Sequence, residues 1–404
     1  MKKTEKKVPV LFSRKGDCCG CGACAAACPM QAIAMVEDPF GFLYPVIDEE
    51  KCICCGKCKK VCGFQSWLVS NTPLRTYAAV SEDRGQSAQS ASGGVFAAMA
   101  SQVLERGGLV CGAAYDADWT VRHELIAQPR ELVRLQGSKY THSHTRDAYT
   151  AVKAALEQGK TVLFSGTPCQ ISGLYGYLGG DRENLITVDI VCHGVPSGRF
   201  FREFVHSLER ENSAEAVAFS FRDKKLGWGK NGSITLKKQG KTYKKYLWEN
   251  ENSYFYYFAQ GALSRENCQS CPYACSARPA DVTLGDYWGI EKAHPDYLRR
   301  EPMSDAVGIS VVVANTEKGI AALERYGHGL CLHESTFEKA AAGNHRLRSA
   351  AGSDRREAVL QEYAQGGWDA VEARFRKKIG WRRYTSRLKA MLPTPAKRFL
   401  KRLR

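Results

Sequence analysis

Two runs of cysteine near the start of the chain constrain its fold more than any other feature. Both have the spacing C-x-x-C-x-x-C-x-x-x-C. This spacing holds 4Fe–4S clusters in pairs, because the fourth cysteine of each run reaches across to the other cluster. By this rule one cluster is expected on Cys18, Cys21, Cys24 and Cys62, and the other on Cys52, Cys55, Cys58 and Cys28.

Other uses of these cysteines fit the sequence less well. A disulfide scaffold needs an oxidising compartment, and the lysine-rich start lacks the apolar core of a signal peptide. Zinc sites rarely need four cysteines at this spacing, twice. Cys19 and Cys54 fall outside the pattern, and we expect them to be spectators.

The composition is that of a soluble globular protein with two or three domains. Of 404 residues, 44% are apolar and 25% are charged, and no apolar run is as long as a membrane span. We therefore expect a cytoplasmic protein, in which the 17 cysteines are better explained as metal ligands than as disulfides.

The formal charge of +16 lies at the two ends of the chain. Residues 1–15 hold six basic residues against one acidic, and residues 371–404 hold thirteen against one. This distribution argues against a nucleic-acid groove, which needs a basic folded face. A basic amphipathic stripe at 396–403 would allow peripheral contact with an anionic membrane surface, and a solvated tail is the alternative.

Turn-forming residues and the period of the apolar residues divide the chain after the cysteine runs. Residues 1–70 are expected to form a two-cluster ferredoxin-type domain that can be removed without unfolding the rest. From Thr76 onward strand and helix patterns alternate, which favours an α/β domain with a largely parallel sheet. Residues 329–404 are expected to form a helical, basic tail.

Two predicted strands end in a cysteine-containing loop. Cys169 follows the apolar run 161–165, and Cys192 follows 185–191. Neighbouring strands lie about 4.8 Å apart. If these two strands are neighbours, the two cysteines lie side by side at the carboxyl edge, where ligands bind in such sheets. Cys268 and Cys271 would then complete a third 4Fe–4S site. Two alternatives stay open: Cys169 and Cys192 are small buried hydrophobes, or Cys268, Cys271 and Cys275 bind zinc.

Two glycine-containing segments could contact a cofactor with phosphates. Ser92, Gly93 and Gly94 open a predicted helix, whose N-terminus attracts anions, although a serine cap with packing glycines explains them equally well. The segment 137–140 offers a turn, a hydroxyl, a cation and an aromatic face, which suit an isoalloxazine and its phosphates. The glycines at 227, 229 and 232 match a dinucleotide motif, but no strand precedes them and no helix follows.

Seven blocks in one order resemble a known family. They are SGGVF (92–96), GSKY (137–140), GTPCQ (166–170), CHGVPS (192–197), FRDKKLGW (221–228), the Cys268/Cys271 pair and ADVTLGDYWG (280–289). Together with the N-terminal cluster domain, they resemble the beta subunits of coenzyme F-420 (deazaflavin) hydrogenases and dehydrogenases. The resemblance implies an FAD-binding α/β domain over residues 71–157 and 158–328.

The resemblance also implies roles for individual residues. It strengthens the third cluster on Cys169, Cys192, Cys268 and Cys271, and it makes Ser92, Gly93, Gly94, Ser138 and Lys139 flavin contacts. Asp286 and Trp288 would line the same cavity, with a strand-end turn and a core tryptophan as the alternative. His142 and His144 do not belong to the resembling blocks, and we expect them at the surface.

The sequence therefore predicts an iron–sulfur flavoprotein oxidoreductase. Ferredoxin-like carriers would exchange electrons with the N-terminal clusters, and a flavin would exchange hydride with an unidentified small molecule. His193 is the candidate proton donor, with a structural histidine as the alternative. A non-catalytic electron-transfer subunit of a larger complex, or a redox-sensing protein, are the rival hypotheses.

Overall fold

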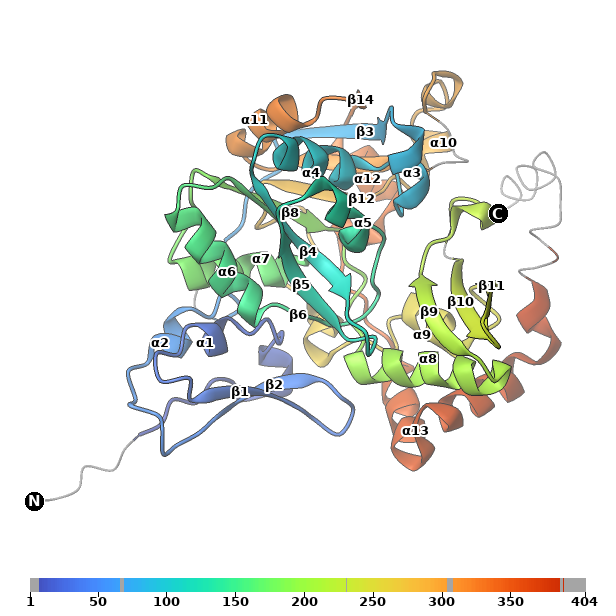
Figure 1. Cartoon of the computed structure of the whole chain (residues 1–404), viewed down its shortest axis with the longest axis horizontal. Helices are drawn as coiled ribbons and strands as arrows, with labels where there is room; N and C mark the ends of the chain where they lie inside the picture. The colour runs from blue at the N-terminus through green and yellow to red at the C-terminus, as the bar shows by residue number, and fades with distance from the viewer. Residues whose placement is uncertain (1–6, 66–68, 230, 304–307, 386–387, 389–404) are drawn as a thin grey trace, which may run out of the picture.

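The computed structural model describes residues 7–65, 69–229, 231–303, 308–385 and 388. Figure 1 shows a small N-terminal module at the lower left and a large sheet with helices above it. A three-stranded sheet with long helices lies at the lower right. The C-terminal stripe at 396–403 lies outside the described residues.

The N-terminal module is a two-stranded sheet flanked by the two cysteine loops. Strands β1 (Ile33–Glu37) and β2 (Leu43–Ile47) pair antiparallel. The loops end in the short helices α1 (Ala23–Ala26) and α2 (Lys57–Lys60), and a 3-10 turn at Lys15–Asp17 precedes the first loop. The cysteines are therefore held by loops and single helical turns rather than by regular structure.

The large sheet has nine strands in the order β14-β3-β13-β12-β8-β7-β4-β5-β6. Its central strands β12, β8, β7 and β4 are mutually parallel, whereas β13, β3, β14 and β5 join through antiparallel pairs. The predicted α/β class with a parallel sheet is thus confirmed at the centre, with mixed edges. The strands are β3 (Arg75–Ser81), β4 (Leu109–Tyr115), β5 (Val121–Ile126), β6 (Ser143–His144), β7 (Val162–Gly166), β8 (Leu185–Ile190), β12 (Val282–Asp286), β13 (Ser310–Ala314) and β14 (Leu330–Ser335).

Helices cover both faces of this sheet, because its central strands are apolar on both sides. On one face, α4 (Val95–Glu105) and α11 (Glu317–Tyr326) pack on β4, β7, β8, β12 and β13. On the other face lie α6 (Arg146–Glu157), α7 (Pro168–Leu178) and, near β3, α12 (Phe337–Gly343). Each parallel strand is therefore buried along its length and ends in a loop at the edge of the sheet.

The three-stranded sheet has the antiparallel order β11-β10-β9. It packs on α8, α9 and α13 through a mostly aromatic core that includes Phe200, Phe204, Tyr254 and Trp368. Helix α13 is interrupted at Gly366 and Gly367, whose backbones are not helical. The elements are α8 (Gly198–Asn212), β9 (Glu215–Ser220), β10 (Gly232–Lys238), β11 (Lys241–Leu247), α9 (Ser253–Ala259) and α13 (Arg356–Ile379).

The C-terminal segment differs from the expected helical tail. Strand β14 (Leu330–Ser335) extends the large sheet beside β3 before the helices begin. Its side chains are only half-buried, so its sequence lacks the continuous apolar run of a central strand. The remaining short elements are α3 (Arg84–Gln89), α5 (Leu132–Leu135), α10 (Ile290–Ala293) and 3-10 turns at Pro129–Glu131, Lys224–Leu226, Glu266–Ser270, Tyr297–Arg299, His345–Leu347 and Gly380–Tyr384.

The N-terminal module shares its core with the rest of the chain. Ala23 is buried among residues of α6 and α7, and Phe42 and Tyr44 belong to the aromatic core under α8. In α7, Gly176 lies directly against the backbone of Val61. This shared packing bears directly on the expectation that the module can be removed without unfolding the rest, which stays a prediction. In the part of the chain that the structure describes, no helix is long and apolar enough to cross a membrane.

Candidate cofactor-binding site

The two cysteine runs turn around α1 and α2 with matching backbone conformations. Gly22 and Gly56 precede the helices with φ of 75° and 70°. Two residues earlier in each run, Gly20 and Cys54 also have positive φ. Cys54 therefore occupies a turn position for which the first run uses glycine, the residue best suited to it.

Three of the four ligands predicted for the first cluster lie close together, namely Cys18, Cys24 and Cys62, whereas Cys21 lines the main cavity. Burial and, after it, the charges of Cys18 and Cys62 raise the pKa of Cys24 to about 12, so these three thiols are neighbours. The other set lines one small cavity and consists of Cys28, Cys52, Cys55 and Cys58.

The chemistry and spread of these donors suit cubane clusters. Backbone N–H groups donate to sulfur in both runs, from Ala32 to Cys28 at 3.3 Å and from Cys54 to Cys52 at 3.4 Å. Such hydrogen bonds help to set cluster potentials. Among the described residues, no three His, Cys, Asp or Glu side chains are grouped to hold a single metal ion. The 4Fe–4S assignment of the two runs rests on their spacing and on these N–H donors.

The third predicted set forms at the carboxyl edge of the large sheet. Strands β7 and β8 are parallel neighbours, so the loops that carry Cys169 and Cys192 lie side by side. Burial and the charges of Cys169 and, more weakly, Cys271 raise the pKa of Cys192 to about 12. Burial and the charges of Cys192 and Cys169 likewise raise the pKa of Cys268. The four cysteines are therefore near enough to affect one another's charge, and their role as ligands of one cluster stays a prediction.

Two other cysteines take positions that the sequence did not predict. Cys19, expected to be a spectator, is buried close to Cys169, whose pKa its thiol raises, so it lies between the first run and the third set. Cys275 instead donates to the carbonyls of Pro272 and Ala277, both at 3.2 Å. These bonds do not join Cys275 to Cys268 or Cys271, so they lend no support to the zinc alternative.

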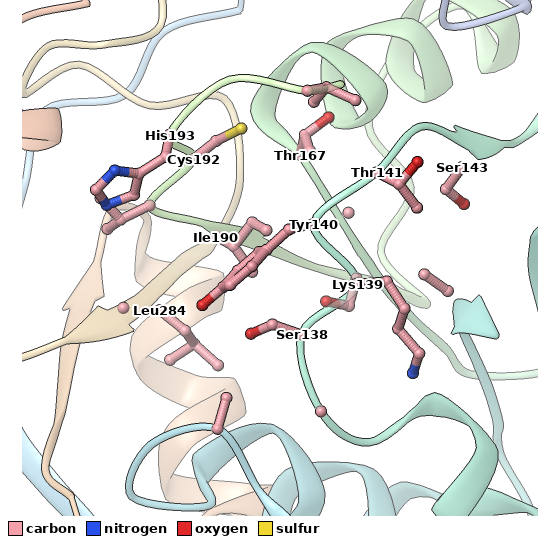
Figure 2. A pocket seen from close by; sticks show the side chains of 18 of the residues that line it. Ser138, Lys139, Tyr140, Thr141, Ser143, Thr167, Ile190, Cys192, His193 and Leu284 are labelled. Carbon is pink, nitrogen blue, oxygen red and sulfur yellow. The ribbon is translucent and has the colours of Figure 1, made fainter. Parts of the chain in front are cut away.

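A cavity of about 290 Å³ opens beside the third cysteine set. Figure 2 shows Ser138, Tyr140 and Ile190 around its centre, with Cys192 and His193 at one end. The predicted site residues that line it are Cys21, Ser92, Gly94, Ser138, Lys139, Cys169, Cys192, His193, Cys268, Asp286 and Trp288. Gly93 and Cys271 do not line it. Gly93 instead packs against the backbone of Ala79, and its N–H donates to Ser310 Oγ at 2.9 Å.

One wall of the cavity is a buried ion pair. Arg222 donates to both carboxylate oxygens of Asp286, at 2.8 and 3.0 Å, and Trp228 Nε1 donates to Asp286 Oδ1 at 2.7 Å. Burial opposes the charge of Arg222, but the Tyr140 hydroxyl and the Asp286 carboxylate raise its pKa. Trp288 stacks on Trp228 with ring centroids 4.7 Å apart. Asp286 is thus occupied in holding Arg222, a cavity residue that the sequence analysis did not single out.

The cavity lining also contains a lysine whose amine is already hydrogen-bonded. Lys139 Nζ donates to the carbonyls of Arg134 and Gln136, at 2.9 and 2.8 Å, and in Figure 2 it points away from Cys192. Burial lowers the pKa of Lys139 to about 7. Its direct contact with a phosphate would require these bonds to break, so its aliphatic stem is the part available to a ligand.

Aromatic and imidazole groups complete the lining. Tyr140 and Phe258 stack with centroids 4.5 Å apart, and the His193 ring lies 6.4 Å from Phe258. His142 also lines the cavity, and burial holds its pKa well below the usual range. The expectation of a surface position for His142 was therefore wrong. Its flanking residues are polar, which gave no sign of burial.

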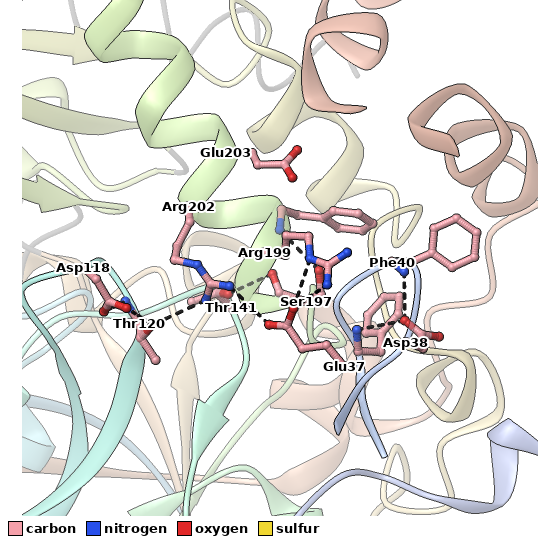
Figure 3. Close-up of polar contacts among 12 residues, drawn as sticks. Glu37, Asp38, Phe40, Asp118, Thr120, Thr141, Ser197, Arg199, Arg202 and Glu203 are labelled. Atoms are coloured by element: carbon pink, nitrogen blue, oxygen red, sulfur yellow. Dashed lines mark hydrogen bonds and ion pairs between the residues drawn. The ribbon is translucent and has the colours of Figure 1, made fainter. Parts of the chain in front are cut away.

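A polar network fixes the N-terminal module against the cavity domain. Glu37 of β1 accepts hydrogen bonds from Arg199 at 2.6 Å and from Arg202 at 3.1 Å. Arg199 also donates to the carbonyl of Pro39 at 2.9 Å. Figure 3 shows both arginines reaching from α8 toward Glu37. These bonds, with the shared cores, keep the three cysteine sets in fixed relation.

Family comparisons match the same parts of the chain. Residues 17–66 match the 4Fe-4S dicluster domain. Residues 76–149 and 159–339 match the N-terminal and C-terminal models of the coenzyme F420 hydrogenase/dehydrogenase beta subunit. The chain belongs to this beta-subunit family. This F420 beta-subunit homologue thus joins a 4Fe–4S domain to an oxidoreductase-family domain, as the resemblance predicted.

Individual relatives are distant or short. One of the subunits of the F(420)H(2) dehydrogenase of Methanosarcina mazei is 26% identical over 162 residues, 38% of this chain and 46% of that protein. A component of the Na(+)-translocating ferredoxin:NAD(+) oxidoreductase complex of Acetobacterium woodii is 47% identical over 45 residues, 11% of this chain and 12% of the relative. The matches therefore span less than half the length of either relative.

Solved structures include one similar chain in the F420-reducing [NiFe] hydrogenase complex from Methanosarcina barkeri. It aligns with a TM-score of 0.42 at 14% identity and covers 77% of this chain and 95% of its own.

Proposed function

We propose that this F420 beta-subunit homologue transfers electrons between a ferredoxin-like carrier and a flavin, through two 4Fe–4S clusters in the N-terminal module and a third at the sheet edge. The observation that carries the proposal is the third cysteine set: Cys169, Cys192 and Cys268 line the main cavity, and Cys19 of the first loop lies close to Cys169. The flavin is FAD by family resemblance.

The cavity suits the ring of a flavin. It lies where parallel strands end, the usual ligand position in such sheets, and the stacked Tyr140 and Phe258 offer it an aromatic face. When bound, a flavin supplies the exchange between single electrons and a hydride that protein side chains cannot perform. The chain's own part is to orient the ring and to exclude water.

Two cavity residues have proposed roles in charge and proton handling. Arg222, held by Asp286 and Tyr140, presents a fixed positive charge to any anion that forms on the ligand. His193, beside Cys192, is positioned to hold a proton near the cysteine end of the cavity. The substrate class is a small molecule that accepts or donates hydride, and a deazaflavin coenzyme is the first to test because the family is named for it.

The carrier would dock at the second cluster. Cys55 is exposed there, beside the exposed side chain of Ile53. Lys57 and Lys60 of α2 are also exposed and form no ion pair among those described. An apolar centre with a basic rim complements an acidic electron carrier. Such a carrier fits a cytoplasmic location.

A second candidate function is electron transfer without independent turnover. It is favoured because the relatives above are named as subunits of larger enzymes, and such a chain can depend on a separate catalytic partner. Hydride transfer by the isolated chain, measured with reduced carrier and an oxidised deazaflavin, separates the two. Turnover supports the first function, and flavin reduction without turnover supports the second.

Cofactor analysis is the direct test of the proposal. Protein purified without oxygen should contain about twelve iron atoms, three cubanes of four, and one flavin per chain. A count of eight iron atoms per chain would refute the third cluster, and absence of flavin would refute the hydride function.

A further inference from the structure

Arg265 lies at the junction of the N-terminal module and the third cysteine set. Its side chain is almost completely buried, with 1% exposure. Nε donates to the carbonyl of Cys18 at 2.9 Å, and Nη2 lies 3.8 Å from Cys18 Sγ. The guanidinium sits over the Tyr44 ring, 4.0 Å from its centroid. Arg265 therefore touches a ligand of the first cluster directly.

The same residue is tied to the third set through its backbone. The Arg265 carbonyl accepts the N–H of Cys268 at 3.1 Å, and the Arg265 N–H donates to Val195 at 3.0 Å. Arg265 also lines the main cavity. Its position is thus between two cysteine sets, one on each side of the interface.

Arg265 has no carboxylate partner, in contrast to the other buried arginines of the described residues. Arg222 pairs with Asp286 at 2.8 Å and Arg278 pairs with Asp189 at 3.1 Å. Arg265 forms no ion pair with any described carboxylate, and its Nη1 has no hydrogen-bond partner. An unpaired buried cation costs several kcal/mol. Such a cost calls for an anion nearby, and a cubane with four thiolate ligands is an anion in both redox states.

We propose that Arg265 is a positioning residue that holds a fixed positive charge between the first and third clusters and raises the reduction potential of the first. Reduction adds one electron and one negative charge to that cluster, with no bond formed or broken, and a nearby cation stabilises the more negative state. The inference rests on the clusters of the proposed function, but it needs neither flavin nor substrate.

The test compares full-length holoproteins purified without oxygen. Arg265→Gln and Arg265→Met remove the charge, Arg265→Lys keeps it, and Arg356→Gln is the matched control. Arg356 also lies at this interface, where it donates to Ser264 O at 2.8 Å and contacts no cysteine in the bonds described. Midpoint potentials of the clusters are read by EPR at poised potentials, and iron is counted in the same samples.

We expect both neutral variants to disfavour reduction of one N-terminal cluster by at least about tenfold, which is 59 mV for one electron. The lysine variant should stay closer to wild type, and Arg356→Gln should match it. Unchanged potentials in a fully loaded neutral variant would overturn the proposal. If the neutral variants lose iron, full loading of Arg265→Lys supports a requirement for charge, whereas equal loss refutes it. A chain without flavin but with shifted potentials would refute only the hydride function.

Discussion

Substitution of Gly176 by alanine tests whether the N-terminal module is an integral part of the fold. A Cβ at this position would overlap the carbonyl oxygen of Val61, which is backbone and cannot rotate away. Overpacking of this kind typically costs about 1–3 kcal/mol. Because every 1.4 kcal/mol is tenfold in an equilibrium constant, opening of the interface should become about fivefold to 150-fold more frequent.

Hydrogen exchange measured by mass spectrometry reports this opening segment by segment. In Gly176→Ala we expect faster exchange in peptides that cover α2 and Val61, with little change in β10 and β11. Gly352→Ala is the control, because it lies away from α7 and its Cβ would come no closer than 3.9 Å to a neighbour, the carbonyl oxygen of Gln269. Exchange in α2 that stays within twofold of wild type would show that the module is held elsewhere.

Two further predictions concern the cavity and the docking surface. Asp286→Asn leaves Arg222 buried without its carboxylate partner. Flavin retention, measured by fluorescence after gel filtration, should therefore fall at least about tenfold. Retention equal to that of the wild type would contradict the role of the Arg222–Asp286 pair. Lys57→Glu combined with Lys60→Glu should slow cluster reduction by an acidic ferredoxin and flatten its salt dependence in stopped-flow measurements. The exposed Lys160→Glu should do neither, and an equal effect there would indicate only a change in net charge.

The sequence predicted what depends on local spacing. Cysteines three residues apart can share one cluster only on a tight loop, so the first three ligands of each set follow from the spacing, and the fourth from the crossing rule. The apolar strands that end at Gly166 and Ile190 are equally local, and their parallel pairing places Cys169 beside Cys192. Strand β14 escaped prediction because half-buried edge strands lack such a run.

What the sequence could not predict depends on contacts between distant segments. Cys19 is outside the cluster spacing, and its contact with Cys169 exists only because α1 packs on α7. The residues next to Arg265 in the sequence do not indicate its role, because its hydrogen-bond partner Cys18 is 247 residues away. Charged residues are rarely fully buried, so a sequence reading places such an arginine at the surface by default.

The measurement that tests the account most directly is flavin reduction in Cys268→Ala, with Cys275→Ala as its control. Reduced ferredoxin is mixed rapidly with each anaerobic holoprotein and flavin absorbance is followed. Cys268 belongs to the third set, so its loss should lower the iron count from about twelve to about eight and slow flavin reduction strongly while flavin remains bound. Cys275, which bonds only to nearby carbonyls, should behave as wild type. Flavin reduction at the full rate in Cys268→Ala would contradict a path through the third cluster.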